Sequence, residues 1–181
     1  MRRLTITGSV LLCALVATSA CVTQQKYNAM LQQQQSLEAS LQKEVSADQV
    51  KIEQLENGIR VRMSNELLYR SGAVELHPDG RAALDKVAGQ LASMAAQGNH
   101  VDVVGNTDDV PVGRELAERY PTNWELAAAR AAVVTRYLHE KGVGGAQLAA
   151  VSRGQYDPVA PNDTAAGRAQ NRRTDLLIRP K

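Results

Sequence analysis

An arginine on the apolar side of a helical segment is the first residue of this chain that points to chemistry. At about 100° per residue, Arg130 falls within the apolar arc of residues 123–141, on the same face as Asn123 and Leu126. A guanidinium beside an apolar surface is costly unless an anion meets it. Two interpretations are open: the head reaches water or an internal carboxylate, or it grips a ligand carboxylate with its planar fork.

A candidate anionic partner lies upstream of this arginine, at the end of a predicted strand. Residues 101–105 are a short apolar run ending in glycine, and Asn-Thr-Asp-Asp follows at 106–109. Ligands gather at strand ends in βα units, so Asp108 is expected to face Arg130 across a short gap. The same four residues also suit an ordinary turn, because Asn and Asp favour turns. Both interpretations stay open at this point.

The elements that must position these two groups alternate along the second part of the chain. Alternating apolar residues predict a strand at residues 59–63, and helical spacing predicts helices that open at Pro78 and Asn123. Further strands are expected at residues 101–104, 148–152 and 176–178, with a short helical turn near Arg168. Strands interleaved with helices indicate βαβ units packed in two layers.

The N-terminus has the pattern of an export signal. Two arginines at positions 2 and 3 precede an apolar run at residues 10–20 that ends in small residues and is too short to span a bilayer comfortably. Residues 1–20 are therefore predicted to be a signal peptide. Its removal would lower the basic residues from 21 to 19, equal to the 19 acidic ones. A neutral mature chain argues against nucleic acid as a partner.

Cys21 stands directly after Thr-Ser-Ala, a context that resembles a bacterial lipoprotein cleavage site. There it would become the first mature residue and carry acyl chains such as palmitate, and each buried methylene contributes about 0.8 kcal/mol to membrane anchoring. Val22 at the second mature position resembles lipoproteins sorted to the outer membrane, whereas Thr18 departs from the usual leucine. The alternative is ordinary cleavage after Ala20, which leaves a free thiol.

Residues 21–58 are predicted to be a helical spacer that carries the lipidated cysteine. Residues 22–57 contain no Gly and no Pro, and a helix of that extent would reach roughly 54 Å. Apolar and aromatic residues recur there at heptad spacing: Tyr27, Leu31, Leu41, Val45, Ile52, Leu55 and Ile59. This spacing supports either a weak coiled coil, with self-association through residues 27–59, or a single solvated helix. Asn57-Gly58 is the expected domain boundary.

Three motifs in order resemble the OmpA-like C-terminal domain, the peptidoglycan-binding module of outer-membrane proteins, Pal-type lipoproteins and flagellar stator proteins. They are NTDD at 106–109, NWELAAARA at 123–131 and GRAQNRR at 167–173. The resemblance implies an α+β fold, a two-layer βαβαβ domain with a mixed sheet over residues 59–181, preceded by a long N-terminal helix. The segment 110–122 is longer than in Pal-type members.

The resemblance also implies a ligand, the diaminopimelate of the peptidoglycan stem peptide, and residues that bind it. Asp108 and Arg130 match the family's ligand-binding aspartate and arginine. Further positions of the same pocket are matched by Thr107, through its backbone amide, by Asn123 and Leu126, and by Asn171 and Arg172, with Arg173 beside them. Diaminopimelate presents an ammonium and a carboxylate on one carbon, which suits one anionic and one cationic side chain.

The expected function is therefore a non-enzymatic tether on the periplasmic face of the cell outer membrane, with peptidoglycan and, through Cys21, the membrane as partners. The alternatives are a structural component of an envelope or motor-type assembly that uses wall binding as an anchor, and a peptidoglycan hydrolase. A hydrolase needs two carboxylates at set separation, and nothing in the sequence marks such a pair. His77, His100 and His139 are scattered, and no cofactor or metal is expected.

Overall fold

The structure, a computed structural model, describes residues 9–180. The side chains of residues 9–23 and of Lys26 fall outside this description, and so do the predicted cleavage at residue 20 and the lipidation of Cys21. None of the helices within the described residues is long and apolar enough to cross a membrane.

A five-stranded mixed sheet forms one layer of the domain, in the spatial order β1-β2-β5-β3-β4. β3 and β4 are parallel, and the other neighbouring pairs are antiparallel. The strands are β1 (Val50–Leu55), β2 (Gly58–Ser64), β3 (His100–Asn106), β4 (Leu148–Gly154) and β5 (Arg173–Arg179). The predicted α+β class with a mixed sheet is thereby confirmed.

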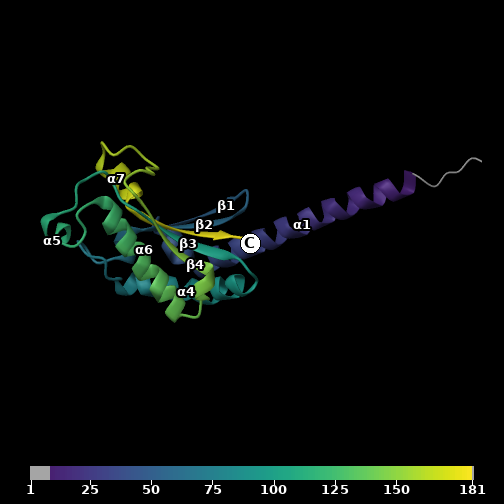
Figure 1. Ribbon diagram of the computed structural model, residues 1–181, viewed down its shortest axis with the longest axis horizontal. Helices are drawn as coiled ribbons and strands as arrows, with labels where there is room; N and C mark the ends of the chain where they lie inside the picture. The colour runs from purple at the N-terminus through teal and green to yellow at the C-terminus, as the bar shows by residue number, and fades with distance from the viewer. Residues whose placement is uncertain (1–8, 181) are drawn as a thin grey trace, which may run out of the picture.

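Two long helices, α4 (Pro78–Ala96) and α6 (Asn123–Glu140), form the second layer on one face of the sheet (Figure 1). The longest helix, α1 (Ser9–Ser40), projects away from the domain. The short helical elements are α2 (Gln42–Ser46), α3 (Asn65–Leu68), α5 (Arg114–Ala117), η1 (Gly145–Gln147) and α7 (Ala165–Asn171). α5, α7 and the start of α6 lie at the end of the domain opposite to α1 (Figure 1).

The core is made of apolar rows that run across the sheet beneath these helices. One row joins Ile59, Ile178 and Val101, and the next joins Val61, Leu176 and Val103, all buried. The third row is no longer purely apolar. In it, Thr174 pairs with Met63 on one side and with Gly105 on the other. The core therefore turns from apolar to polar toward the strand ends where the candidate residues lie.

The predicted helix over residues 22–57 is wrong in its last part. α1 ends at Ser40, and residues 50–55 form the edge strand β1, which pairs with β2 in full register from Val50↔Met63 to Leu55↔Gly58. Asn-Gly between two alternating segments is a hairpin signal, and here it closes the β1–β2 turn rather than marking a domain boundary. Asp48 lies in the turn between α2 and β1. Its φ of 56° is in the left-handed region, which Asp tolerates.

Three of the heptad positions after residue 36 are used inside the domain. Leu41 and Ile59 are buried in the core, together with Leu37, and Ile52 packs against it, whereas Val45 is exposed. Two polar contacts fix the same region to α4: Lys86 Nζ to Glu44 Oε1 at 2.6 Å, and Gln90 Nε2 to Ser40 Oγ at 2.7 Å. A seam between two copies is thus confined to the projecting part of α1, where self-association stays a prediction.

Leu41→Ala should lower the free energy of unfolding by about 2–5 kcal/mol, because it removes a side chain with no exposed surface from the core. Val45→Ala, at a neighbouring position that is 38% exposed, is the matched control and should change stability by less than about 0.5 kcal/mol. Urea unfolding followed by circular dichroism measures both. Equal, small effects would mean that the end of α1 is not part of the folded domain.

Candidate functional site

Arg130 lies on α6 with its guanidinium largely withdrawn from water. Its Nε and Nη2 both donate to the carbonyl oxygen of Ala73, at 3.2 and 3.0 Å, and its Cζ lies 5.2 Å from the centre of the Tyr69 ring. Burial lowers the pKa of Arg130, and the nearby Glu66 and Asp108 oppose that shift. Among residues 9–180, Arg130 forms no ion pair, and its Nη1 makes no hydrogen bond. The cation is held by a carbonyl dipole and an aromatic face instead of a carboxylate.

Asp108 pairs with Arg172 rather than with Arg130, which corrects the expected direct contact. Its Oδ2 accepts from Nη1 of Arg172 at 2.9 Å, while its Oδ1 accepts from the amide of Val110 at 3.2 Å. Arg172 also donates from Nε and Nη2 to one oxygen of Glu66, at 3.0 and 2.7 Å. Burial opposes the charged form of Arg172, but the hydrogen bonds to these two carboxylates raise its pKa overall.

The polar end of the core supports the floor of this charge cluster. The Tyr69 hydroxyl lies 3.0 Å from Thr174 Oγ1, which donates to Asn65 Oδ1 at 3.1 Å. Asn65 Nδ2 in turn donates to the carbonyl of Asn106 at 3.2 Å. This chain of bonds joins the ring beneath Arg130 to the strand end that carries Asp108, so the two halves of the site share one rigid base.

Close approach of α6 and β3 sets the distance between the two halves. A Cβ on Gly105 would lie 2.2 Å from the carbonyl oxygen of Ala127, so only glycine fits at this strand end. The helix begins with a capping box, in which Thr122 accepts from the amide of Trp124 and Glu125 accepts from the amide of Thr122. The start of α6 is therefore fixed both laterally and along its axis.

The other positions implied by the resemblance are brought to the same end of the domain, mostly in supporting places. Asn123 Nδ2 donates to the carbonyls of Asp108 and Val110, at 3.3 and 3.0 Å, and so holds the loop after β3. The amide of Thr107 already donates to the carbonyl of Gly154 at 2.8 Å, so the expected amide for a ligand is engaged within the protein. Leu126 is buried and lies outside the main apolar cluster.

Asn171 and Arg173 hold the loop before α7. The Asn171 amide is fully buried, accepts from the amides of Val159 and Ala160, and donates to the carbonyl of Ala160 and to Asn162. Arg173 is buried between Asp157 and Asp175, with contacts of 2.8 and 3.1 Å. Of the arginine motif, only Arg172 turns toward Asp108.

Several groups at this site were not predicted from the sequence. Glu66, Tyr69 and the Ala73 carbonyl come from the segment after β2, more than fifty residues before Arg130 in the chain. A local signal for one of these groups is Ser64, a residue type that favours the N-cap of a helix. Its hydroxyl caps α3, and Glu66 lies in the first turn of that helix. No group of three or more His, Cys, Asp or Glu side chains within the described residues is arranged to hold a metal ion.

A surface cavity of about 560 Å³ lies beside this charge cluster, on the other side of the segment that Arg130 holds. Its walls come from residues 74–76, from α4 and α6, and from Tyr120 of the segment 110–122. Asp108, Arg130 and Arg172 are not among its lining residues. The charged groups described above, at the strand ends, therefore do not line this cavity.

Comparisons with known proteins identify the family and show the same fold. The chain belongs to the OmpA family, which matches residues 68–172. It is 29% identical over 128 residues to "Motility protein B" of Helicobacter pylori, covering 70% of this chain and 48% of that protein. It is 32% identical over 141 residues to "Outer-membrane lipoprotein YfiB" of Pseudomonas aeruginosa, covering 74% and 78%. The chain thus spans about half the length of the motility protein but most of the lipoprotein.

Solved structures show the same architecture. A MotB-like protein from Desulfovibrio vulgaris superimposes with a TM-score of 0.77 at 26% identity, over 88% of this chain and 96% of that one. The cell wall anchor of the type VI secretion system from Pseudomonas aeruginosa gives 0.71 at 28% identity, over 80% and 97%. The second of these proteins is described as a cell wall anchor.

Tyr69→Phe should remove a pH-dependent part of the stability. Burial raises the pKa of Tyr69 from 10.0 to about 12, so the folded state keeps the neutral phenol after the unfolded state has ionised. That contribution, about 2–3 kcal/mol, is complete below pH 10 and is lost as the pH rises to 12. Urea unfolding at pH 8 and pH 11.5 should show a smaller decrease for Tyr69→Phe than for the wild type. Equal decreases would place the Tyr69 hydroxyl in water.

Proposed function

We propose that this protein binds peptidoglycan non-covalently through the diaminopimelate of its stem peptide, and so tethers the outer membrane to the cell wall. The observation that carries the proposal is the unpaired Arg130 beside the carboxylates of Asp108 and Glu66. The OmpA family membership supports it, as does the name of a relative, "Peptidoglycan-binding protein ArfA" of Mycobacterium bovis, 32% identical over 124 residues.

The arrangement of charges suits the zwitterionic end of diaminopimelate. A ligand carboxylate can accept from the free Nη1 of Arg130, where a charge-assisted bond in a partly dry site contributes about 1.5–3 kcal/mol. The ligand ammonium can donate to Glu66 Oε2, which Arg172 does not contact. It can also donate to Asp108, because a carboxylate oxygen that already accepts one hydrogen bond can accept another. Arg172 keeps the two carboxylates together, while Asn123 and Asn171 hold the loops around them.

Anchoring to the membrane rests on the junction sequence at Cys21 and on relatives named as lipoproteins. "Outer-membrane lipoprotein YfiB" and "Probable lipoprotein YiaD" of Escherichia coli both match this chain, the latter at 30% identity over 143 residues. Acyl chains on Cys21 would place the membrane at the N-terminal end of α1. The site lies at the opposite end of the domain, where α7 and the start of α6 meet (Figure 1).

A second candidate function is that of a wall anchor within a larger envelope assembly. The similarity to the motility proteins and to the type VI secretion anchor favours it. Both candidates use the same wall-binding site, and they differ in whether the projecting part of α1 contacts other subunits. None of the relatives named above is named as a hydrolase.

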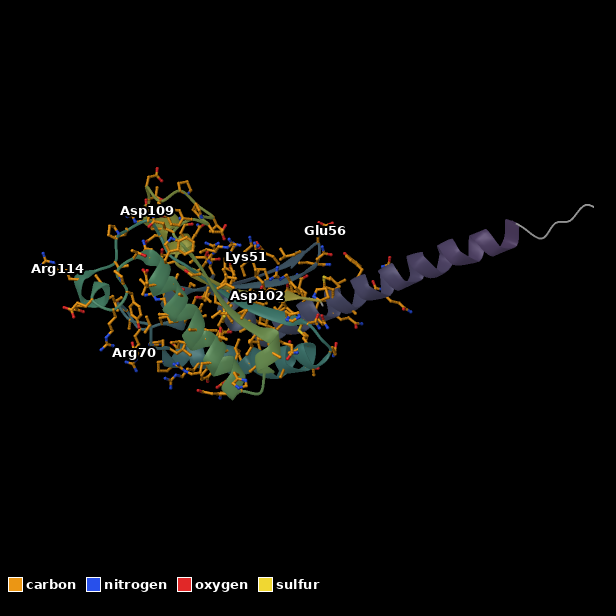
Figure 2. All side chains as sticks on the ribbon, viewed as in Figure 1. Lys51, Glu56, Arg70, Asp102, Asp109 and Arg114 are labelled. Atoms are coloured by element: carbon orange, nitrogen blue, oxygen red, sulfur yellow. The ribbon has the colours of Figure 1, made fainter. Side chains whose placement is uncertain are left out.

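Asp108→Asn and Arg130→Gln should each weaken peptidoglycan binding by about tenfold or more, because each removes a charge-assisted bond to the ligand. Co-sedimentation with isolated cell walls, and NMR titration with diaminopimelate, measure the loss. The matched controls are Asp109→Asn, at the exposed neighbouring position labelled in Figure 2, and Arg136→Gln, exposed on the same helix.

Wild-type binding by both Asp108→Asn and Arg130→Gln would remove the site assignment. A ligand whose terminal carboxylate is amidated should bind the wild type weakly and Arg130→Gln no worse. The same co-sedimentation samples test the enzymatic alternative, because a hydrolase would release soluble muropeptides and lose that activity in Asp108→Asn.

Cys21→Ser should release the protein from the membrane fraction, because the acylated thiol is replaced by a hydroxyl that lipoprotein processing does not modify. Cell fractionation and metabolic labelling with palmitate measure this, and Cys13→Ser, within the predicted signal peptide, is the control that should keep both the label and the membrane location. Retention of label in Cys21→Ser would contradict lipidation at this cysteine.

A further inference from the structure

Two exposed aromatic rings stack on each other beside the candidate site. Trp124, at the start of α6, and Tyr156, in the loop after β4, have ring centroids 5.4 Å apart and an interplanar angle of 28°. They are 45% and 68% exposed, in a chain with one tryptophan and no phenylalanine. Exposed aromatic surface of this kind is typical of binding surfaces, where a flat apolar face meets a partner. We call this pair the aromatic platform.

The aromatic platform is held in position by the loops around Asp108. Asn123 and Gln155, which directly precede the two aromatic residues, are hydrogen-bonded at 2.9 Å, and the same Asn123 amide reaches the Asp108 carbonyl at 3.3 Å. Ser152 Oγ donates to the Trp124 carbonyl at 2.9 Å. Gly154, at φ +54°, lies against Trp124, and a Cβ there would come within 3.4 Å of the indole. The platform and the carboxylate therefore move as one unit.

Exposed apolar side chains gather at this end of the domain. Of the six large hydrophobic residues exposed within the described part of the chain, four lie in the loops around the site or at the start of α6: Val110, Trp124, Tyr156 and Val159. The other two, Tyr27 and Val45, lie on the N-terminal helices. Exposed aromatic rings next to a cluster of charges suit a ligand that is charged at one end and has an apolar face at the other.

We propose that the aromatic platform stacks an amino-sugar ring of the glycan strand to which the bound stem peptide is attached. The inference rests on the proposed function, because the sugar is brought there by the peptide. A pyranose has an apolar C–H face, which packs on an aromatic ring, and a polar edge, which stays in water. A short stretch of peptide joins diaminopimelate to its sugar, and each extended residue spans at most about 3.5 Å. The side chain of Asn123 contacts the Asp108 carbonyl, and Trp124 is the next residue along the chain. A few residues of stem peptide are therefore long enough to reach from Asp108 to the aromatic platform.

The test compares two ligands that differ only in the sugar: a stem peptide containing diaminopimelate, and the same peptide carrying its disaccharide. Titration calorimetry on the full chain should give about three- to tenfold tighter binding of the disaccharide ligand by the wild type. Trp124→Ala and Tyr156→Ala should remove this advantage and leave the affinity for the sugar-free peptide unchanged. Trp124→Phe should keep most of it, and Tyr27→Ala, at an exposed tyrosine on α1, should keep all of it.

The single tryptophan gives a direct second readout. Indole fluorescence of the wild type should shift with the disaccharide ligand and not with the sugar-free peptide. An equal affinity of the wild type for both ligands, an advantage that survives in Trp124→Ala, or a loss of sugar-free peptide binding in Trp124→Ala would each overturn the proposal. Asp108→Asn should lose affinity for both ligands, and failure of the wild type to bind either would overturn the proposed function and this inference with it.

Discussion

A half-buried guanidinium without a carboxylate partner is the constraint around which this domain is arranged. Arg130 donates to the carbonyl oxygen of Ala73 and lies over the ring of Tyr69. These two contacts offset only part of the free-energy cost of removing a cation from water. The nearest acidic groups are instead paired with Arg172. If Asp108 and Arg130 contacted each other directly, a zwitterionic ligand would have to break an ion pair before forming its own. In the observed arrangement Arg172 pairs with both carboxylates, and Arg130 has no carboxylate partner among the described residues.

The surrounding fold supports this arrangement through polar groups placed where the apolar core ends. The rows through Val101 and Val103 are purely apolar, whereas the next row contains Thr174 and Gly105. Thr174 accepts the hydroxyl of Tyr69, and the missing side chain of Gly105 lets α6 approach β3 closely. Thr174 and Gly105 contribute less apolar area to this end of the core than the larger apolar residues of the neighbouring rows. The polar groups also form a chain of hydrogen bonds beneath the charged groups, which ends at the carbonyl of Asn106; the buried side-chain oxygen of Asn106 itself has no partner among the described residues.

The local sequence pattern was enough to predict most helices and strands and the position of Arg130. It was not enough to predict which distant residues pair with each other. Helical periodicity identified Arg130, alternation identified the strand at residues 59–63, and three further strands were predicted from short segments between the helices. The edge strand β1 was read as helix because Gln-rich sequence without Gly or Pro continues smoothly into it, and only pairing with β2 makes it a strand. The partnership of Asp108 with Arg172 joins residues 64 positions apart, and that of Arg172 with Glu66 joins residues 106 apart. Neither spacing leaves a local signature. The motif likewise grouped Asn171 with the ligand contacts, although its amide is consumed by the loop it holds.

The position of the site relative to α1 bears on how strongly the site must bind. A few charge-assisted bonds, less the cost of ordering a flexible peptide, give modest affinity for one stem peptide. A domain fixed to a membrane that faces a polymeric wall meets ligand at a high effective concentration, so modest affinity suffices for lasting attachment. Such an attachment is useful only if anchor and site point in opposite directions, and here α1 leaves the domain at the end away from α6 and α7 (Figure 1). Leu37 and Leu41 are buried in the core, so the end of α1 and the residue that follows it are built into the domain rather than attached to its surface.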